Sequence, residues 1–173
     1  TASSDSTLNF VNGASSVVFD STYDVYIFKF INIHVSSNDA VFRVNFRDGS
    51  TNYDATKTTS FFRTYNAESG SPSALIYASS HDSSQSTSAA DIITSNGTGN
   101  DESASGTLTI FNPSSTTFVK HFISDCSVYH SGNLAQRLLV GGYVNVTAAV
   151  DAVQFEMESG NIDSGTIKLY GVG

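Results

Sequence analysis

The stretch that decides the fold is VQFEMESGNIDSGTIKLYG, residues 153–171. Its first six residues alternate between apolar and polar side chains, which is the period of a half-buried β-strand. Residues 159–161, Ser-Gly-Asn, then supply a turn, because Gly and Asn both tolerate positive φ. A second run follows in which Ile167 and Leu169 share one face. The segment predicts two strands around one turn.

Further alternating runs extend upstream from this segment, and no stretch shows sustained helical periodicity. Only a short helix near 135–139 stays open as an alternative. About nine or ten strands with frequent turns between them are typical of a sandwich, and that number favours a jelly roll over an immunoglobulin-like fold. We therefore expect an all-β protein, an antiparallel jelly-roll-like β-sandwich. Besides the closing segment, the expected strands are 17–19, 23–35, 40–47, 53–64, 74–78, 107–111, 120–129 and 138–146.

The length of 173 residues fits a single domain spanning 1–173. Two segments stand apart from the strand pattern. Residues 1–7 are small and polar, and are expected to form a flexible N-terminal arm. Residues 79–106 are rich in Ser, Thr, Asp, Asn and Gly, with Ile92-Ile93 as the only apolar pair, and are expected to form a long polar loop. This loop is interpreted either as a surface connection or as a projection that contacts a neighbour.

The run 23–35 is the longest apolar stretch and is apolar on both faces. In a sandwich only one face of a strand meets the core, so the other face needs a covering loop or a subunit partner. Tyr26, Phe28, Phe30 and His34 lie on one face and are the candidate interface residues. They motivate the prediction of a homo-oligomer.

Composition narrows the classes of function. The net charge is −8 with only eight Lys and Arg residues, which argues against nucleic-acid binding. No long apolar run predicts a membrane span. Cys126 is the single cysteine, so the chain has no internal disulfide, as expected for a protein assembled in the cytoplasm. We expect this thiol to be a small buried hydrophobe.

Residues that carry chemistry do not form a recognisable catalytic pattern, so no enzyme, catalytic residue, cofactor or metal is predicted. The histidines at 34, 81, 121 and 130 lack metal-ligand spacing. Glu156 and Glu158 are about 7 Å apart along one strand, a spacing compatible with glycoside hydrolysis, but a solvated strand face is the favoured interpretation. Weaker alternatives are calcium near Asp91, Asp101 and Glu102, and sugar stacking on Tyr53, Tyr65, Tyr77 and Tyr129 in a chain without Trp.

Three patches carry a resemblance to a known group of proteins. They are the closing pattern at 159–171 (Ser-Gly-Asn-Ile, then Ser-Gly-Thr-Ile and Leu-Tyr-Gly), Ser-Val-Val-Phe at 16–19 with Tyr-Asp-Val-Tyr at 23–26, and Thr-Leu-Thr-Ile-Phe-Asn-Pro at 107–113. In these patches the chain resembles small all-β virion structural proteins of tailed bacteriophages, especially phages of aquatic bacteria. Such proteins serve as capsid decoration or as tail and fibre components.

The resemblance implies a virion structural protein, assembled in the host bacterial cytoplasm. Because the net charge of −8 disfavours a position facing the DNA, we expect it on the outer surface of the virion. The favoured role is a capsid decoration (cement) protein that stabilises the shell through subunit contacts, with no chemistry. Its expected partners are itself, as a homotrimer by analogy, and the major capsid protein or other virion proteins; neither nucleic acid nor a membrane is expected. The alternative is a tail-fibre or receptor-binding module that recognises a host surface glycan.

Overall fold

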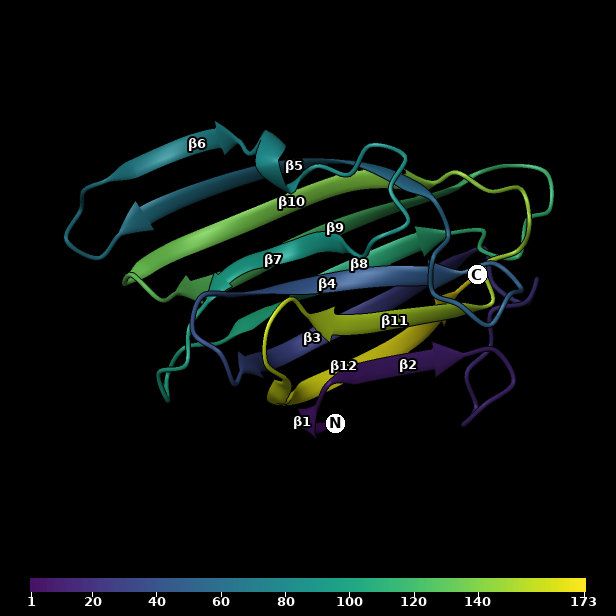
Figure 1. The fold of residues 1–173 in the computed structure, drawn as a ribbon, viewed down its shortest axis with the longest axis horizontal. Coiled ribbons are helices and arrows are strands. Elements are labelled where there is room, and N and C mark those ends of the chain that lie inside the picture. Colours follow the sequence, from purple (N-terminus) through teal and green to yellow (C-terminus); the bar gives the residue numbers. More distant parts are fainter.

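A computed structural model describes all residues 1–173, and apart from a single 3-10 turn, η1 (Ser79–His81), its regular elements are antiparallel β-strands (Figure 1). The all-β class is therefore confirmed. The strands are β1 (Ala2–Asp5), β2 (Thr7–Val11), β3 (Val25–Val35), β4 (Ala40–Arg47), β5 (Lys57–Ala67), β6 (Ser73–Tyr77), β7 (Ala90–Asn96), β8 (Ala104–Phe111), β9 (Lys120–His130), β10 (Leu134–Val144), β11 (Ala152–Met157) and β12 (Ile162–Val172).

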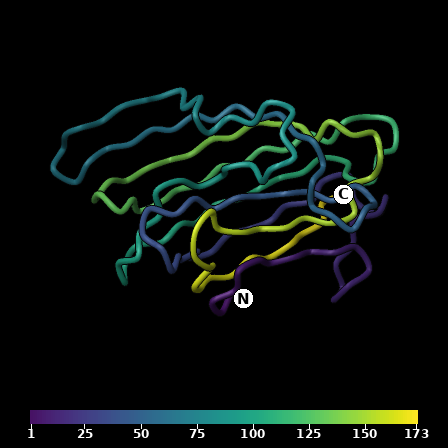
Figure 2. Tube along the Cα trace, in the orientation of Figure 1, coloured from purple at the N-terminus to yellow at the C-terminus, as the bar shows by residue number.

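The centre of the fold is a four-stranded ribbon that bends back on itself. In one layer the strands run in the order β1-β12-β3-β8, and in the other layer their counterparts run β2-β11-β4-β7. Each strand of the first layer is joined directly in sequence to its counterpart in the second, through Ser6 or through the segments 36–39, 97–103 and 158–161. We name these four connections the corners. They lie toward the left of Figure 1, and the path can be followed in the trace of Figure 2.

Asn161 ties adjacent corners together. Its backbone N–H donates to Ser36 Oγ at 2.7 Å, and its carbonyl accepts from the Ser36 N–H at 3.1 Å. Its side-chain amide donates to the Ser4 carbonyl at 3.1 Å. Gly160 precedes it at φ 71°, and a Cβ there would lie 2.6 Å from Ser36 Oγ. The Ser-Gly-Asn turn therefore fits closely between the two neighbouring corners.

The two closing strands lie on opposite layers. The predicted turn at 159–161 and the two strands are present, but β11 pairs with β2 and β4 whereas β12 pairs with β1 and β3. The terminal segment is therefore a layer crossing and not a hairpin. Its apolar face is as expected, since Val153 and Phe155 are fully buried.

The first layer continues beyond β8 through β9, β10, β5 and β6. At the other side β7 meets β9 through a single residue pair, Asn96 with His130. The strands thus form one antiparallel sheet that nearly closes into a barrel. The β5–β6 hairpin projects past the barrel at the upper left of Figure 1.

Aromatic rings fill the space inside the bent ribbon, with Phe155 at their centre. Its ring lies 5.1 Å from that of Phe28 and 5.2 Å from that of Phe30, both on the opposite layer. It stacks on Phe42 of its own layer at 5.6 Å, and Phe10 of β2 approaches edge-on at 6.0 Å. Edge-to-face and stacked pairs of this kind add to the free energy gained by burying the rings.

Three of the four residues predicted to form a subunit interface lie in the core of the single chain. Tyr26, Phe28 and Phe30 are at most 2% exposed in a single chain, where they belong to the core. Asn32 adopts a φ of 50° and marks a bulge where the register with β8 shifts. Because the bulge reverses the alternation, Ile33 and Val35 of the second apolar set also turn inward, whereas Ile31 stays 40% exposed. His34 lies partly exposed at the corners, 3.3 Å from Asp163 and 3.2 Å from the Gly99 carbonyl.

Several segments differ from their predicted structure. The arm at 1–7 contains β1, whose Ala2 pairs with Gly165 and is 5% exposed. The polar loop at 79–106 contains η1, the buried strand β7 and the first residues of β8, so only its remainder is loop. Residues 17–19 are not a strand, although Phe19 is buried. The region 135–139 lies in β10 and is not helical.

Two neighbouring glycines in β10 allow a matched test of packing. A Cβ on Gly142 would lie 2.7 Å from Phe122 Cζ and 2.8 Å from the Thr58 carbonyl oxygen, whereas a Cβ on Gly141 would meet nothing closer than 4.0 Å. We expect Gly142→Ala to lower the free energy of unfolding by about 1–3 kcal/mol through overpacking. Gly141→Ala should change it by less than about 0.5 kcal/mol. Urea unfolding followed by circular dichroism measures both, and equal effects would contradict the assigned faces.

Candidate interaction surface

Large apolar side chains lie close together on the outward face of strands β9, β10, β5 and β6. Five of them are well exposed, from 40% for Leu139 to 76% for Leu75. The strand register makes them contiguous, because Phe62 lies between Leu139 and Tyr77, and the Phe62 and Tyr77 rings are 5.2 Å apart. We call this surface the outer patch; it consists of Phe62, Leu75, Tyr77, Ile123 and Leu139.

The outer patch is bordered by a charged pair of side chains and includes β6, an edge strand whose outer side has no partner strand. Arg137 and Asp125 form an exposed two-point ion pair beside it, at 2.9 and 2.6 Å. Strand β6 pairs only with β5, so its other edge is free. The strand, residues 73–77, is Ser-Ala-Leu-Ile-Tyr and has no charged residue. Edge strands usually carry charges, bulges or prolines that prevent pairing with another chain, and β6 has none within it.

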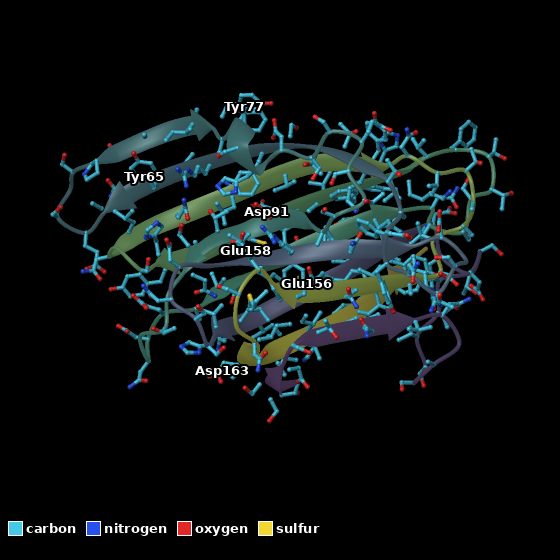
Figure 3. All side chains as sticks on the ribbon, viewed as in Figure 1. Tyr65, Tyr77, Asp91, Glu156, Glu158 and Asp163 are labelled. Atoms are coloured by element: carbon cyan, nitrogen blue, oxygen red, sulfur yellow. The ribbon has the colours of Figure 1, made fainter.

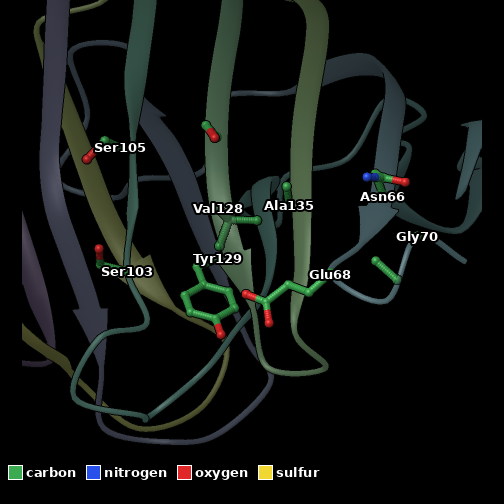
Figure 4. Close-up of a pocket in the computed structure, with 10 residues that line it drawn as sticks. Asn66, Glu68, Gly70, Ser103, Ser105, Val128, Tyr129 and Ala135 are labelled. Carbon is green, nitrogen blue, oxygen red and sulfur yellow. The ribbon is translucent and has the colours of Figure 1, made fainter. Parts of the chain in front are cut away.

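Next to the outer patch the same face is hollowed, as Figure 4 shows. The hollow has a volume of about 580 Å³ and lies over β8, β9 and β10, beside the turn that joins β5 to β6. Small side chains form its floor, and Tyr129 and Glu68 lie together at one side. The other lining residues are Asn66, Ala67, Gly70, Ser103, Ser105, Ser127, Val128 and Ala135.

The hollow has a negative electrostatic character. The pKa of the Tyr129 hydroxyl is raised, chiefly by its hydrogen bond to Glu68. Burial and the negative charges of Glu68, Asp101 and Glu102 raise it further. No Lys or Arg lines the hollow. Anionic ligands are therefore disfavoured there.

A second polar cluster connects the 79–89 segment to β4 and β7. Asp91 accepts hydrogen bonds from Arg43 Nε at 2.7 Å and from His81 Nδ1 at 2.8 Å, and Arg43 also donates to Glu158 at 2.9 Å. Burial alone would raise the pKa of Asp91, but the hydrogen bonds from His81 and Arg43 outweigh it, so the pKa is lowered. A catalytic triad would need a serine or threonine hydroxyl bonded to the other side of the imidazole ring. The hydrogen bond of the His81 side chain is the one to Asp91. The cluster has the character of a structural ion-pair network.

The candidate carboxylates are dispersed rather than convergent. Asp91 belongs to β7 and Glu158 follows β11, the two strands that flank β4, and Arg43 of β4 bridges both carboxylates (Figure 3). Glu156 lies beside Arg43 in the strand register, on the solvated face that its alternation predicted. Glu102 accepts the Gly99 N–H at 2.6 Å, away from Asp91. No group of three or more His, Cys, Asp or Glu side chains is arranged to hold a metal ion.

The remaining predicted residues are spread over the molecule. Cys126 is 1% exposed, which confirms its prediction as a buried small side chain, and burial raises its pKa to about 11. His121 faces outward and His130 partly inward from the same strand, as expected. Of the candidate stacking tyrosines, Tyr129 lines the hollow and Tyr77 lies in the outer patch. Tyr53 lies under Arg47, and Tyr65 lines a smaller depression adjoining the hollow.

Two lysines are fully buried, which the sequence pattern did not indicate. Lys57 and Lys120 are both register partners of Val144, from opposite sides of β10. The Lys57 ammonium donates to the Ser88 carbonyl at 2.8 Å. The Lys120 ammonium donates to three consecutive carbonyls at 146–148. Backbone carbonyls thus take the place of carboxylate partners for both charges.

Comparison with known proteins gives no assignment. No family model, curated protein or solved structure matches the chain. The chain also has no helix long and apolar enough to cross a membrane. The outer patch and the hollow are the surface features that bear on its function. The apolar residues of 74–78 are the one sign of the patch in the sequence, and the hollow has none, because it depends on small residues of three different strands.

Proposed function

We propose that the protein is a virion structural protein of a tailed phage, most plainly an outer capsid decoration protein that acts by surface contacts and performs no chemistry. The observation that carries the contact role is the outer patch. A contiguous apolar surface with polar groups at its rim has the anatomy of a protein-binding site. The phage assignment itself rests on the sequence resemblance, and the net charge of −8 favours an outward position over a DNA-facing one.

A jelly-roll-like fold is the finer architecture that we propose. Its support is the pair of crossings β3 to β4 and β11 to β12, in which two antiparallel strand pairs roll over together from one layer to the other. A ribbon rolled in this way is the feature that jelly rolls share. Such folds are used for contacts in viral capsids, which is consistent with the decoration role.

The occupant that we propose for the outer patch is a second copy of the chain. The free edge of β6 offers backbone donors and acceptors to another extended strand, and antiparallel pairing of β6 with itself brings both patches onto one continuous face. Leu75 is central to this contact because it is the most exposed apolar side chain of the patch.

Self-association gives a direct test of the contact. We expect the protein to sediment as an oligomer, and Leu75→Lys to dissociate it, because the change buries an unpaired charge at the contact. Phe118→Lys is the matched control, since Phe118 is 71% exposed in a loop remote from β6. Analytical ultracentrifugation over a concentration series measures the mass. A concentration-independent monomer would refute the proposed self-contact.

Location on the particle tests the decoration role separately. Antibody labelling and quantitative mass spectrometry of intact virions should find the protein on heads, in proportion to the capsid subunits. A small copy number confined to the tail would exclude decoration.

The second candidate function is a tail-fibre or receptor-binding module that recognises a host glycan. The observation that favours it is the hollow, where an aromatic ring and several polar side chains line an open depression on the outer face.

A further inference from the structure

We propose that the hollow beside Tyr129 binds a saccharide without negative charge. The inference deepens the second candidate function, receptor binding, and is independent of the outer patch. The volume of about 580 Å³ lies within the range of small-molecule sites. Its open shape, on an exposed sheet face, suits the end or side of a glycan chain.

The hollow offers polar groups that are not used elsewhere in the protein. The side chains of Asn66, Ser103 and Ser127 line it and make no hydrogen bond within the chain. Together they supply an amide, which both donates and accepts, and two hydroxyls, which do the same. Sugar hydroxyls need this mixture because each of them is both a donor and an acceptor. The Ser105 hydroxyl is different, since it accepts the Asn32 N–H at 3.0 Å.

Tyr129 supplies the apolar surface that a sugar ring requires. Its side chain is partly exposed, and Asn133 Oδ1, at 3.3 Å, and the Glu68 carboxylate are alternative acceptors for its single hydroxyl proton. Figure 4 shows the Glu68 carboxylate next to this ring. An aromatic face beside a carboxylate acceptor binds the C–H face of a pyranose and one or two of its hydroxyls at the same time.

The surrounding charges decide which sugars fit. Glu68, Asp101 and Glu102 all act on Tyr129, and the cation beside the hollow, Arg137, is already paired with Asp125. Uronic acids, sialic acids and phosphorylated sugars are repelled by this arrangement. Neutral hexoses and N-acetylhexosamines are not. The small residues of the floor, Ser105, Ser127 and Ala135, leave room for a ring to lie against the strands.

The experiment is a chemical-shift titration of the isotope-labelled protein. The probes are neutral trisaccharides of glucose, galactose, mannose and N-acetylglucosamine, with a glucuronic-acid trisaccharide and free glucosamine as charged arms, each up to roughly millimolar concentration. We expect at least one neutral probe to shift the amides of 66–70, 103–105 and 127–135, and the acidic probe to leave them unchanged. If only glucosamine shifts them, the site is a cation site and the proposal is wrong.

Variants make the assignment specific. Tyr129→Ala and Glu68→Gln should each weaken binding about tenfold or more, whereas Tyr129→Phe should retain most of it, because the ring stays. Tyr170→Ala is the matched control, as Tyr170 is a 43% exposed tyrosine on another strand of the same face. Thermal melting confirms that each variant is folded. Absence of any shift with every neutral probe, or unchanged binding by Tyr129→Ala, would overturn the proposal. Neither result bears on self-association, which Leu75→Lys tests.

Discussion

Phe155→Ala is expected to lower the free energy of unfolding by about 3–5 kcal/mol, a large part of the stability of a domain this size. Phe155 is fully buried and touches rings from β2, β3 and β4, so its loss removes contacts within one layer and between both layers. The rigid ribbon can close the resulting cavity only in part. Equilibrium urea unfolding measures the effect.

The matched control is Phe118→Ala. Phe118 is the most exposed phenylalanine, at 71%, and lies in a loop between β8 and β9. Its removal should change the free energy of unfolding by less than about 0.5 kcal/mol. A small effect of Phe155→Ala, comparable with that of the control, would mean that the two layers do not pack through this ring.

Lys57 is expected to make stability depend on pH in the alkaline range. Burial lowers its pKa from 10.5 to about 8 in the folded protein, although the charges of Asp54 and Glu156 partly oppose this shift. Between these two pH values the unfolded chain holds the proton and the folded chain does not, so folding becomes more favourable as the pH rises. The shift corresponds to a gain of about 3 kcal/mol across that window.

Comparison with Lys57→Met isolates this contribution. Cys126 acts in the opposite direction, because its pKa is raised to about 11 and the unfolded thiol ionises first. The wild-type curve alone therefore mixes both effects. Urea unfolding at several pH values from 7 to 10.5 should show the wild type gaining stability relative to the variant. Parallel curves for the two proteins would show that the folded Lys57 keeps its ordinary pKa.

The alternation of apolar and polar residues correctly predicted the strands in which it is regular. β4 begins and ends where its alternation indicates, and the strands of the closing segment follow their apolar residues. β1 and β7 escaped detection because small and hydroxylated residues carry little periodic signal, and their pairing is decided by distant strands. The order of strands in the sheet was likewise not readable, since it depends on which corners lie side by side.

The candidate interface failed for an identifiable reason. Tyr26, Phe28 and Phe30 already face the core, and the bulge at Asn32 turns the following Ile33 and Val35 inward as well, so apolar residues from both faces of the run are buried within one chain. The only local sign of the bulge is the tolerance of Asn for positive φ. The residues of the outer patch lie instead on strands β5, β6, β9 and β10, where each strand contributes one or two side chains. Such a surface becomes visible only when register aligns the strands. The hollow is hidden from the sequence for the same reason, because it forms only where three neighbouring strands each place a small residue on one face.

The position of β12 between β1 and β3 has a consequence for how the chain reaches its folded state. Until residues 162–172 have been synthesised, β1 has no partner strand and β3 has only β8, so the first layer cannot be completed from the N-terminus as the chain leaves the ribosome. Most pairings join residues distant in sequence, as Ala2 and Gly165 are, and such topologies fold slowly because long loops must close first. During this interval β3 keeps one edge unpaired, and rapid synthesis at high concentration favours aggregation over folding.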